Sequence, residues 1–155
     1  MTGTVEARIA SLGLQLPEAP NPVANYVPHL IAGNLLFISG QISKAGDGTI
    51  TKGRLGAELG VGEGQAAARI CALNILSQAK AALGELDRIE RLVKITGFVN
   101  ATAEFTEHPQ VVNGASDLLV EVLGDAGRHT RAAVGVASLP VGCAVEVDAI
   151  FLIGS

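Results

Sequence analysis

The chain has 155 residues, which fits one folded domain with room for a hydrophobic core. Apolar residues make up 48% of it and charged residues 17%, which excludes a disordered chain and predicts that some apolar surface is buried between subunits. The formal net charge of −4 and the shortage of aromatic side chains disfavour a nucleic-acid partner, which needs basic patches and stacking surfaces.

The first part of the chain predicts a helix followed by a β-hairpin. Residues 3–13 carry apolar side chains at helical spacing. Tyr26 to Ile31 and Leu35 to Ile42 are typical of two strands, and Gly33-Asn34 between them favours a tight turn, because both residues tolerate positive φ. Residues 43–60 hold five glycines and are expected to form a loop.

The central part of the chain predicts two long helices with a strand between them. Residues 62–83 have apolar side chains at spacings of three and four, and Gly84 is suited to end that helix. Residues 88–99 are rich in strand-forming side chains. Residues 107–123 repeat the helical spacing and predict the second long helix.

Two strands are predicted to complete the chain, at residues 130–140 and 144–153. Helices that alternate with strands favour an α+β fold, in which a mixed sheet carries both long helices on one face. The other face would stay partly apolar, which predicts an oligomer that closes its sheets against one another. No linker or repeat divides the chain, so residues 1–155 are expected to form a single domain.

Arg131 and Glu146 are the strongest candidate site residues, because each is a charged side chain in an apolar strand. A guanidinium group matches a carboxylate in two hydrogen bonds, so Arg131 predicts a site for a small carboxylate. Glu146 and Asp148 share one strand face, and Glu146 is expected to face Arg131 across the sheet as a general base. The alternative for both positions is a structural ion pair or a solvated face.

Other signals are weak or absent. Cys71 and Cys143 make no metal pattern and are expected to be small buried side chains. The three histidines show no metal-ligand spacing, and we expect no metal site. The sequence has neither a secretory signal nor an apolar run of about 18 residues that could span a membrane, so we expect a cytoplasmic protein with no membrane partner.

Four motifs together resemble the Rid proteins (reactive intermediate deaminases), also called the YjgF family and historically called endoribonuclease L-PSP. They are Tyr26-Val27, Ser39-Gly40-Gln41, Val112-Asn113, and the run from Thr130-Arg131 through Leu139-Pro140 to Glu146. The resemblance covers roughly residues 21–153, and the last motif is the most specific. Residues 1–15 form an extra N-terminal extension, and Ala133 stands where a cysteine is common in the family.

The resemblance implies a chorismate-mutase-like fold, a homotrimer, and clefts between subunits in which 2-imino acids are hydrolysed to 2-keto acids and ammonia. Arg131 would bind the substrate carboxylate and Glu146 would hold the attacking water. Tyr26 would cover the substrate from the neighbouring subunit. The remaining cleft residues would be Ser39, Gly40, Gln41, Asn113 and Ala133. This hydrolysis requires no metal or organic cofactor, because the imine carbon is already electrophilic.

Two other functions remain open. The same cleft could bind a small carboxylate without turnover, although a binding site alone has no need for Glu146. An endoribonuclease is the least favoured function, because the chain is acidic and has no aromatic platform. Residues 1–15 are expected to fold over the outer end of the cleft.

Overall fold

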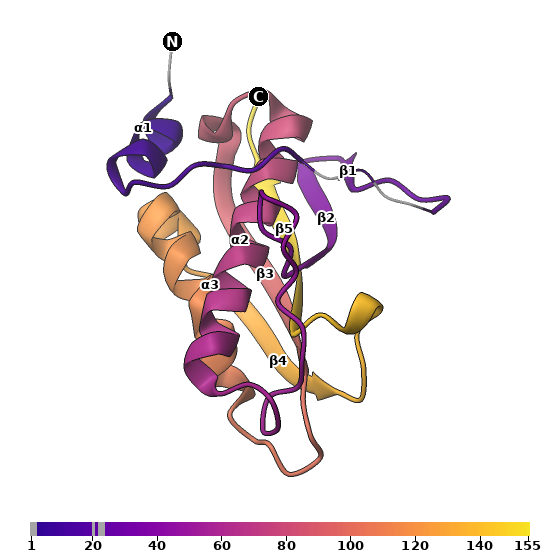
Figure 1. Ribbon diagram of the computed structural model, residues 1–155. Helices are drawn as coiled ribbons and strands as arrows, with labels where there is room; N and C mark the ends of the chain where they lie inside the picture. The colour runs from indigo at the N-terminus through magenta and orange to yellow at the C-terminus, as the bar shows by residue number, and fades with distance from the viewer. Residues whose placement is uncertain (1–2, 20, 22–23) are drawn as a thin grey trace.

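A computed structural model describes residues 3–19, 21 and 24–155. Its main elements are a five-stranded sheet, two long helices and a short N-terminal helix (Figure 1). The strands are β1 (His29–Ala32), β2 (Leu35–Ile42), β3 (Ile89–Asn100), β4 (Thr130–Val136) and β5 (Val145–Ile153). The helices are α1 (Thr4–Ser11), α2 (Val61–Leu83) and α3 (His108–Leu123), with short 3-10 turns η1 (Leu86–Arg88), η2 (Gly124–Gly127) and η3 (Pro140–Gly142).

The predicted α+β architecture is confirmed. The strand order is β1-β2-β5-β3-β4, and every neighbouring pair is antiparallel except β3 and β4, which are parallel. Both long helices lie on one face of this mixed sheet (Figure 1). β4 is an edge strand, while β5 lies in the middle of the sheet between strands that precede it in the chain.

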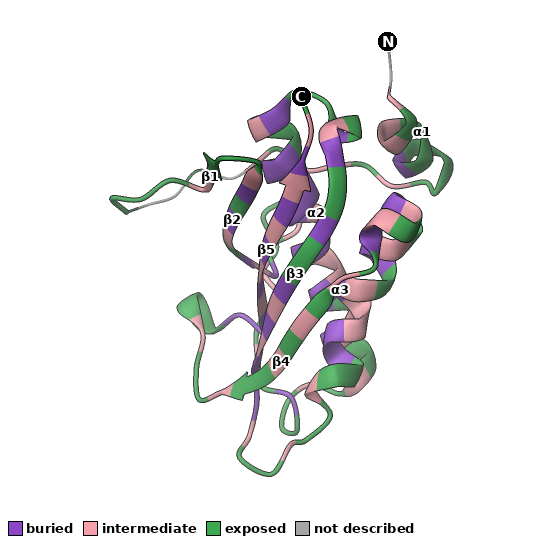
Figure 2. Ribbon diagram, turned by 180° about the vertical axis from the view of Figure 1, so that it is seen from behind, coloured by how far each residue is buried: buried purple, intermediate pink, exposed green. Residues whose placement is uncertain are grey.

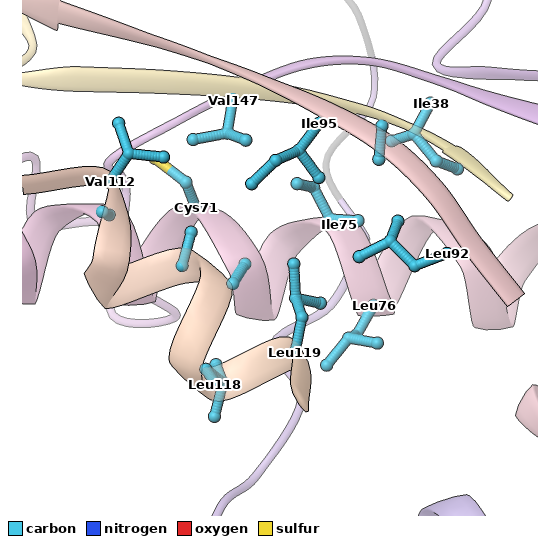
Figure 3. Packing of buried hydrophobic residues seen from close by; sticks show 14 of the residues in the cluster. Ile38, Cys71, Ile75, Leu76, Leu92, Ile95, Val112, Leu118, Leu119 and Val147 are labelled. Carbon is cyan, nitrogen blue, oxygen red and sulfur yellow. The ribbon is translucent and has the colours of Figure 1, made fainter. Parts of the chain in front are cut away.

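The core lies between the sheet and the two long helices. Side chains from α2, α3 and the inner face of the sheet interlock there, as Figure 3 shows for Cys71, Ile75, Leu119 and Val147. Alternate β5 side chains, from Val145 to Ile153, are buried in this core while those between them are only partly covered. Each large apolar side chain that is fully buried contributes about 1.5–3 kcal/mol.

The two long helices approach each other closely through glycine. A side-chain carbon at Gly114 of α3 would overlap the backbone of Gln65 in α2, so any larger residue would push the helices apart. The Gln65 amide donates a hydrogen bond to Gln110 O at 2.9 Å across the same contact. Gly84 ends α2 with φ of 79° and donates its N–H to Lys80 O, as its sequence position predicts.

The hairpin forms around the predicted turn, but its first strand is shorter than predicted. Gly33 has φ of 63°, which suits the two-residue connection between β1 and β2. β1 begins at His29 and not at Tyr26, and Pro28 just before it has no N–H to donate to a strand ladder. Tyr26 and Val27 therefore lie in an exposed segment that leads into the sheet.

The sheet face opposite the helices carries exposed apolar side chains, as predicted. Leu30, Phe37 and Ile150 form one cross-strand row on β1, β2 and β5, and Leu30 and Phe37 are 57% and 37% exposed. Val134 on β4 is 42% exposed on the same side of the sheet. Figure 2 shows this open face from behind. An open apolar sheet face of this kind is suited to burial against another subunit.

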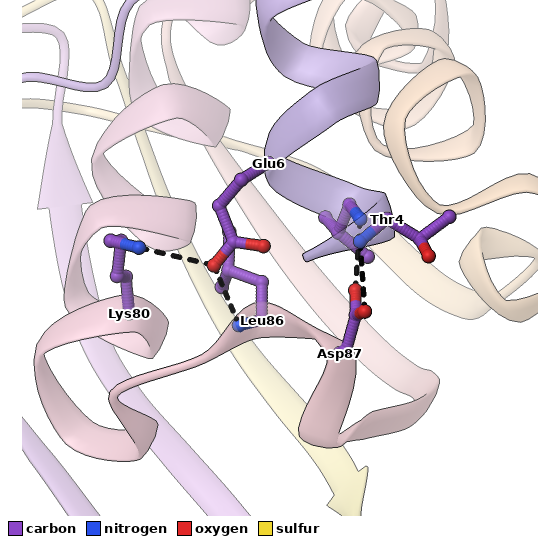
Figure 4. Close-up of polar contacts among 6 residues, drawn as sticks. Thr4, Glu6, Lys80, Leu86 and Asp87 are labelled. Atoms are coloured by element: carbon purple, nitrogen blue, oxygen red, sulfur yellow. Dashed lines mark hydrogen bonds and ion pairs between the residues drawn. The ribbon is translucent and has the colours of Figure 1, made fainter. Parts of the chain in front are cut away.

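The described part of the N-terminal extension is fastened to the helical layer (Figure 4). The Asp87 carboxylate accepts the N–H groups of Thr4 and Val5 at 2.8 Å each, and so caps α1 from η1. Glu6 accepts hydrogen bonds from Lys80 Nζ at 3.1 Å and Leu86 N at 3.0 Å. Residues 1–2 lie outside the described part of the chain, and the position of this segment over a subunit cleft stays a prediction.

Two smaller expectations concern the cysteines and the membrane. Cys71 and Cys143 are fully buried and free, which confirms that they act as small core side chains. Within the described residues, none of the helices combines the length and apolar character needed to cross a bilayer.

Candidate functional site

Arg131 lies on β4 with its side chain directed towards α3. Its partner in the parallel β3–β4 ladder is Ile95, a fully buried core residue, so Arg131 is on the helix-covered face of the sheet. The guanidinium group donates from Nη1 to Ser116 Oγ at 3.0 Å and from Nη2 to Pro109 O at 3.3 Å. No carboxylate among the described residues forms an ion pair with it. The remaining N–H groups of the guanidinium are therefore available to an anion.

Ser116 and His129 support Arg131 in a short hydrogen-bonded chain. His129 Nδ1 lies 2.6 Å from Gly127 O, a carbonyl that can only accept, so Nδ1 carries a proton. Nε2 of the same ring lies 2.9 Å from Ser116 Oγ. With a neutral imidazole, the Ser116 hydroxyl donates to Nε2 and accepts from Arg131. The sequence alone indicates no role for His129 or Ser116, because their link to Arg131 depends on the packing of α3 against β4.

Asn113 and Ala133 lie beside Arg131. Asn113 follows Pro109 by four residues and precedes Ser116 by three, so all three share one side of α3. Ala133 is two residues after Arg131 on the same strand face and packs against the core. We call Arg131, Ala133, Asn113, Ser116 and His129 the arginine half-site.

Glu146 lies on the other face of the sheet. Its neighbours Val145 and Val147 are fully buried in the core, and it pairs with Phe98 of β3 and Ile42 of β2. The Glu146 carboxylate accepts no hydrogen bond from the described residues. Burial, assisted by the nearby charge of Asp148, raises the pKa of Glu146 above its ordinary value. A carboxyl group whose pKa is raised in this way is better suited to accept and return a proton than an ordinary surface carboxylate.

A bulge in β2 positions the backbone next to Glu146. Ser39 and Gly40 occupy the register shift between Ile38 and Gln41, where two residues of β2 oppose one of β5. A side-chain carbon at Gly40 would collide with the Glu146 carboxylate, so this glycine leaves the space that Glu146 fills.

The residues around the bulge hold the segment that contains Tyr26. Ser39 Oγ donates to Val27 O at 2.9 Å, and Tyr26 itself is 54% exposed. Gln41 is buried beneath the bulge and donates to Ser39 O at 2.9 Å, so it supports the backbone and does not face the surface. We call Glu146, Gly40, Ser39 and Tyr26 the glutamate half-site.

The expectation that Glu146 faces Arg131 across the sheet within one chain is wrong. Alternation along a strand fixes the face of each residue relative to its own strand only. The register between strands places Arg131 beside the buried Ile95 and Glu146 beside the partly exposed Phe98, which are on opposite faces of β3. One chain therefore presents two separate half-sites. Within the described residues, no group of three or more histidine, cysteine, aspartate or glutamate side chains could hold a metal ion.

Comparison with known proteins gives one family for this architecture. Residues 6–151 match the family model described as "YjgF/chorismate_mutase-like, putative endoribonuclease". The protein TCP17 of Trypanosoma cruzi is 53% identical over 150 residues, which cover 96% of this chain and 94% of TCP17.

Solved structures show the same fold. A protein of unknown function from Agrobacterium tumefaciens is 49% identical, covers 97% of this chain and 94% of its own, and has a TM-score of 0.88. E. coli TdcF, solved with bound serine, is 25% identical, covers 88% of this chain and 94% of its own, and has a TM-score of 0.65. The smaller share of this chain that TdcF covers is consistent with a subgroup that has additional segments.

Proposed function

The chain belongs to the YjgF/chorismate mutase-like family, and on that premise we propose that it hydrolyses 2-imino acids to 2-keto acids and ammonia in clefts between the subunits of a homotrimer. The observation that carries the proposal is the Arg131 guanidinium group, which is fixed by two neutral oxygens and has no carboxylate partner in the described chain. An arginine prepared in this way is suited to bind a ligand carboxylate.

The opposite positions of the half-sites favour a cleft made by two chains. A head-to-tail ring places a different surface of each subunit against its neighbour, so the arginine half-site of one chain can meet the glutamate half-site of the next. The outward-facing apolar row of Leu30, Phe37 and Ile150, in which Leu30 and Phe37 are exposed and Ile150 is half-buried, supplies surface for such a contact. In this arrangement Tyr26 comes to the substrate from the same chain as Glu146.

The proposed reaction uses positioning and proton transfer. Arg131 holds the substrate carboxylate, so that the imine carbon lies near a water molecule next to Glu146. The substrate reacts as its protonated imine, and Glu146 takes a proton from the water as the water oxygen bonds to the imine carbon and the C=N electron pair moves to nitrogen. Glu146 then gives this proton to the nitrogen of the neutral amino alcohol. The C–N bond breaks as the hydroxyl oxygen forms the keto group and releases its proton to Glu146, which passes it to the departing ammonia, so the products are a 2-keto acid and an ammonium ion. The raised pKa of Glu146 suits these transfers.

A carboxylate-binding module without turnover is the second candidate. TdcF was solved with serine, an amino acid whose carboxylate could occupy an equivalent site without reaction. The feature that favours hydrolysis is Glu146, because a half-buried carboxylate without hydrogen bonds is costly to retain for binding alone. The net charge of −4 and the single tyrosine give no support to a ribonuclease.

A coupled assay tests this proposal. An L-amino-acid oxidase generates the imine in situ, and semicarbazide traps the fraction that escapes hydrolysis. We expect the wild-type protein to suppress trapping and Arg131→Ala to lose this effect while it keeps its oligomeric state. Arg69→Ala is the matched control, because Arg69 on α2 forms no hydrogen bond or ion pair with the described residues. Trapping that is unaffected by wild-type protein, across several imines, would contradict the hydrolysis and favour the binding module.

A further inference from the structure

A second cationic region lies next to the arginine half-site. A cavity of about 460 Å³ opens where the ends of β3 and β4 meet the start of α3 and the segment that contains Arg54. These ends of β3, β4 and α3 lie at the lower end of the molecule in Figure 1. Its lining consists of Arg54, Ala101, Thr102, Ala103, Phe105, His108, Gly135, Val136 and Ala137. We propose that this cavity binds a second acidic group of the substrate, so that the preferred substrates are 2-imino diacids.

The charge of the lining supports an anionic occupant. Arg54 and His108 can both carry positive charge, and the lining contains no carboxylate, although the whole chain has a net charge of −4. The Arg54 guanidinium group forms no hydrogen bond or ion pair with the described residues. Three acids, Glu58, Glu104 and Glu107, are close in the chain to lining residues. The hydrogen bond that the Glu58 carboxylate accepts from the backbone N–H of Arg54 at 2.9 Å, and to a lesser degree the charge of Arg54, lower the pKa of Glu58. This contact fixes the backbone at Arg54 and leaves all its guanidinium donors for a ligand.

The ring of His108 is held by packing. His108 is the first residue of α3, and its ring meets the edge of Phe105 at a centroid distance of 5.4 Å and an angle of 87°. On the β4 side, a side-chain carbon at Gly135 would overlap His108 Nε2. Gly135 therefore provides the space that lets the imidazole lie against the strand.

The cavity and Arg131 are neighbours along β4 and α3. Arg131, Ala133 and Gly135 alternate along one face of β4, so Gly135 is about 13 Å from Arg131 by strand rise. The Arg131 guanidinium leans towards the start of α3, where it bonds Pro109 O, and Pro109 directly follows His108. A diacid whose first carboxylate binds Arg131 would therefore direct its second acidic group along β4 towards the cavity. The distal acidic group takes no part in bond changes and would serve only recognition.

Binding of stable 2-keto acids tests this inference without turnover. 2-Oxoglutarate and 2-oxopentanoate have the same chain length, and only the first carries a distal carboxylate. We expect calorimetry on the full oligomer to give a Kd about tenfold lower for 2-oxoglutarate, since a charge-assisted hydrogen bond contributes about that factor. Arg54→Gln and His108→Asn should each move the ratio of the two Kd values towards one, whereas Arg69→Gln should leave the ratio as in wild type.

The outcomes separate this inference from the proposed function on which it rests. Three results would overturn the diacid site. The two Kd values could be equal in wild type, their ratio could stay unchanged in both Arg54→Gln and His108→Asn, or neither keto acid could bind. A preserved, Arg54-dependent preference together with no imine hydrolysis would overturn the proposed reaction alone. With an active enzyme, the imines of glutamate and norvaline should show the same preference in kcat/KM, and Arg54→Gln should reduce it.

Discussion

The arginine half-site and the glutamate half-site differ in how the fold holds the charged group. Two hydrogen bonds fix Arg131, and Ser116, which accepts one of them, is itself linked to His129. Glu146 accepts no hydrogen bond from the described residues, and burial raises its pKa. A side chain that binds a carboxylate needs a fixed orientation. A side chain that accepts and returns a proton needs a suitable pKa and enough room to move between the two proton positions. The difference fits one binding residue and one proton-transfer residue.

The largest expected effect comes from removing the proton transfer. Glu146→Gln keeps the size of the side chain and removes its basicity, so we expect kcat to fall about 100-fold to 1000-fold with a small change in KM. The coupled trapping assay measures both constants. A rise in KM of about 100-fold to 1000-fold with an unchanged kcat would show instead that Glu146 binds substrate and transfers no proton.

The pH profile provides a second measurement on the same variant. Glu146 must be ionised to accept a proton, so wild-type kcat/KM should fall as the pH drops through the raised pKa of Glu146, which lies above 4.5. The Gln variant should lack this acid limb in its residual activity. An acid limb that persists unchanged would assign it to another group.

Gly40 tests the space around Glu146. Gly40→Ala places a methyl group where the carboxylate lies, and we expect a loss of about tenfold in kcat because a displaced catalytic group acts less efficiently. Gly62→Ala is the matched control, since a side-chain carbon there meets nothing within 4 Å. Equal activity of the two variants would contradict the placement of Glu146 against the bulge.

Ser116 tests the fixed direction of Arg131. Ser116→Ala removes one hydrogen bond to the guanidinium group and the link to His129, so KM should rise by about fivefold to tenfold while kcat changes less. Steady-state kinetics on the same imine separates the two constants. A fall in kcat alone would mean that Ser116 acts in the chemical step.

The smallest expected effect lies outside both half-sites. Burial opposes the ionisation of Glu6, but hydrogen bonds from Leu86 N and Lys80 lower its pKa overall. A lowered pKa in the folded state stabilises the protein above the unfolded-state pKa, and this contribution is lost as the pH falls through the folded-state value. Glu6→Gln should therefore cost about 1 kcal/mol at pH 7 and less in acid, with unchanged activity. The free energy of unfolding, measured with denaturant at pH 7 and again at acidic pH for both proteins, checks this expectation.

The sequence predicted the elements well because their signals are local. The apolar spacing of residues 62–83 and the Gly33-Asn34 turn depend only on neighbouring residues, and the structure has α2 and the hairpin where they indicate. The start of β1 was predicted too early because the residues before Pro28 are apolar enough to resemble a strand. Ser39 instead holds that segment by its own hydrogen bond.

The site was less predictable because it depends on contacts between distant segments. Arg131 and Glu146 were identified correctly as charged residues in apolar strands. Their opposite faces follow from the placement of β5 between β2 and β3 and from the parallel register of β4, and neither is a local signal. The contacts of Ser116 and His129 with Arg131, and the position of Arg54 at the cavity, likewise depend on segments that are distant in the sequence.

Mixed trimers test the central claim, that the site joins half-sites from two chains. Arg131→Ala and Glu146→Gln chains are co-expressed with different tags and purified through both. In the proposed homotrimer, these chains give mixed trimers in which one of three clefts joins an intact Arg131 to an intact Glu146. We predict about a third of wild-type imine hydrolysis from these trimers, while Arg131→Ala alone is inactive and Glu146→Gln alone keeps at most about 1% of the wild-type rate. Mixed trimers as inactive as their parents would contradict the account, because that result requires both residues to act from one chain.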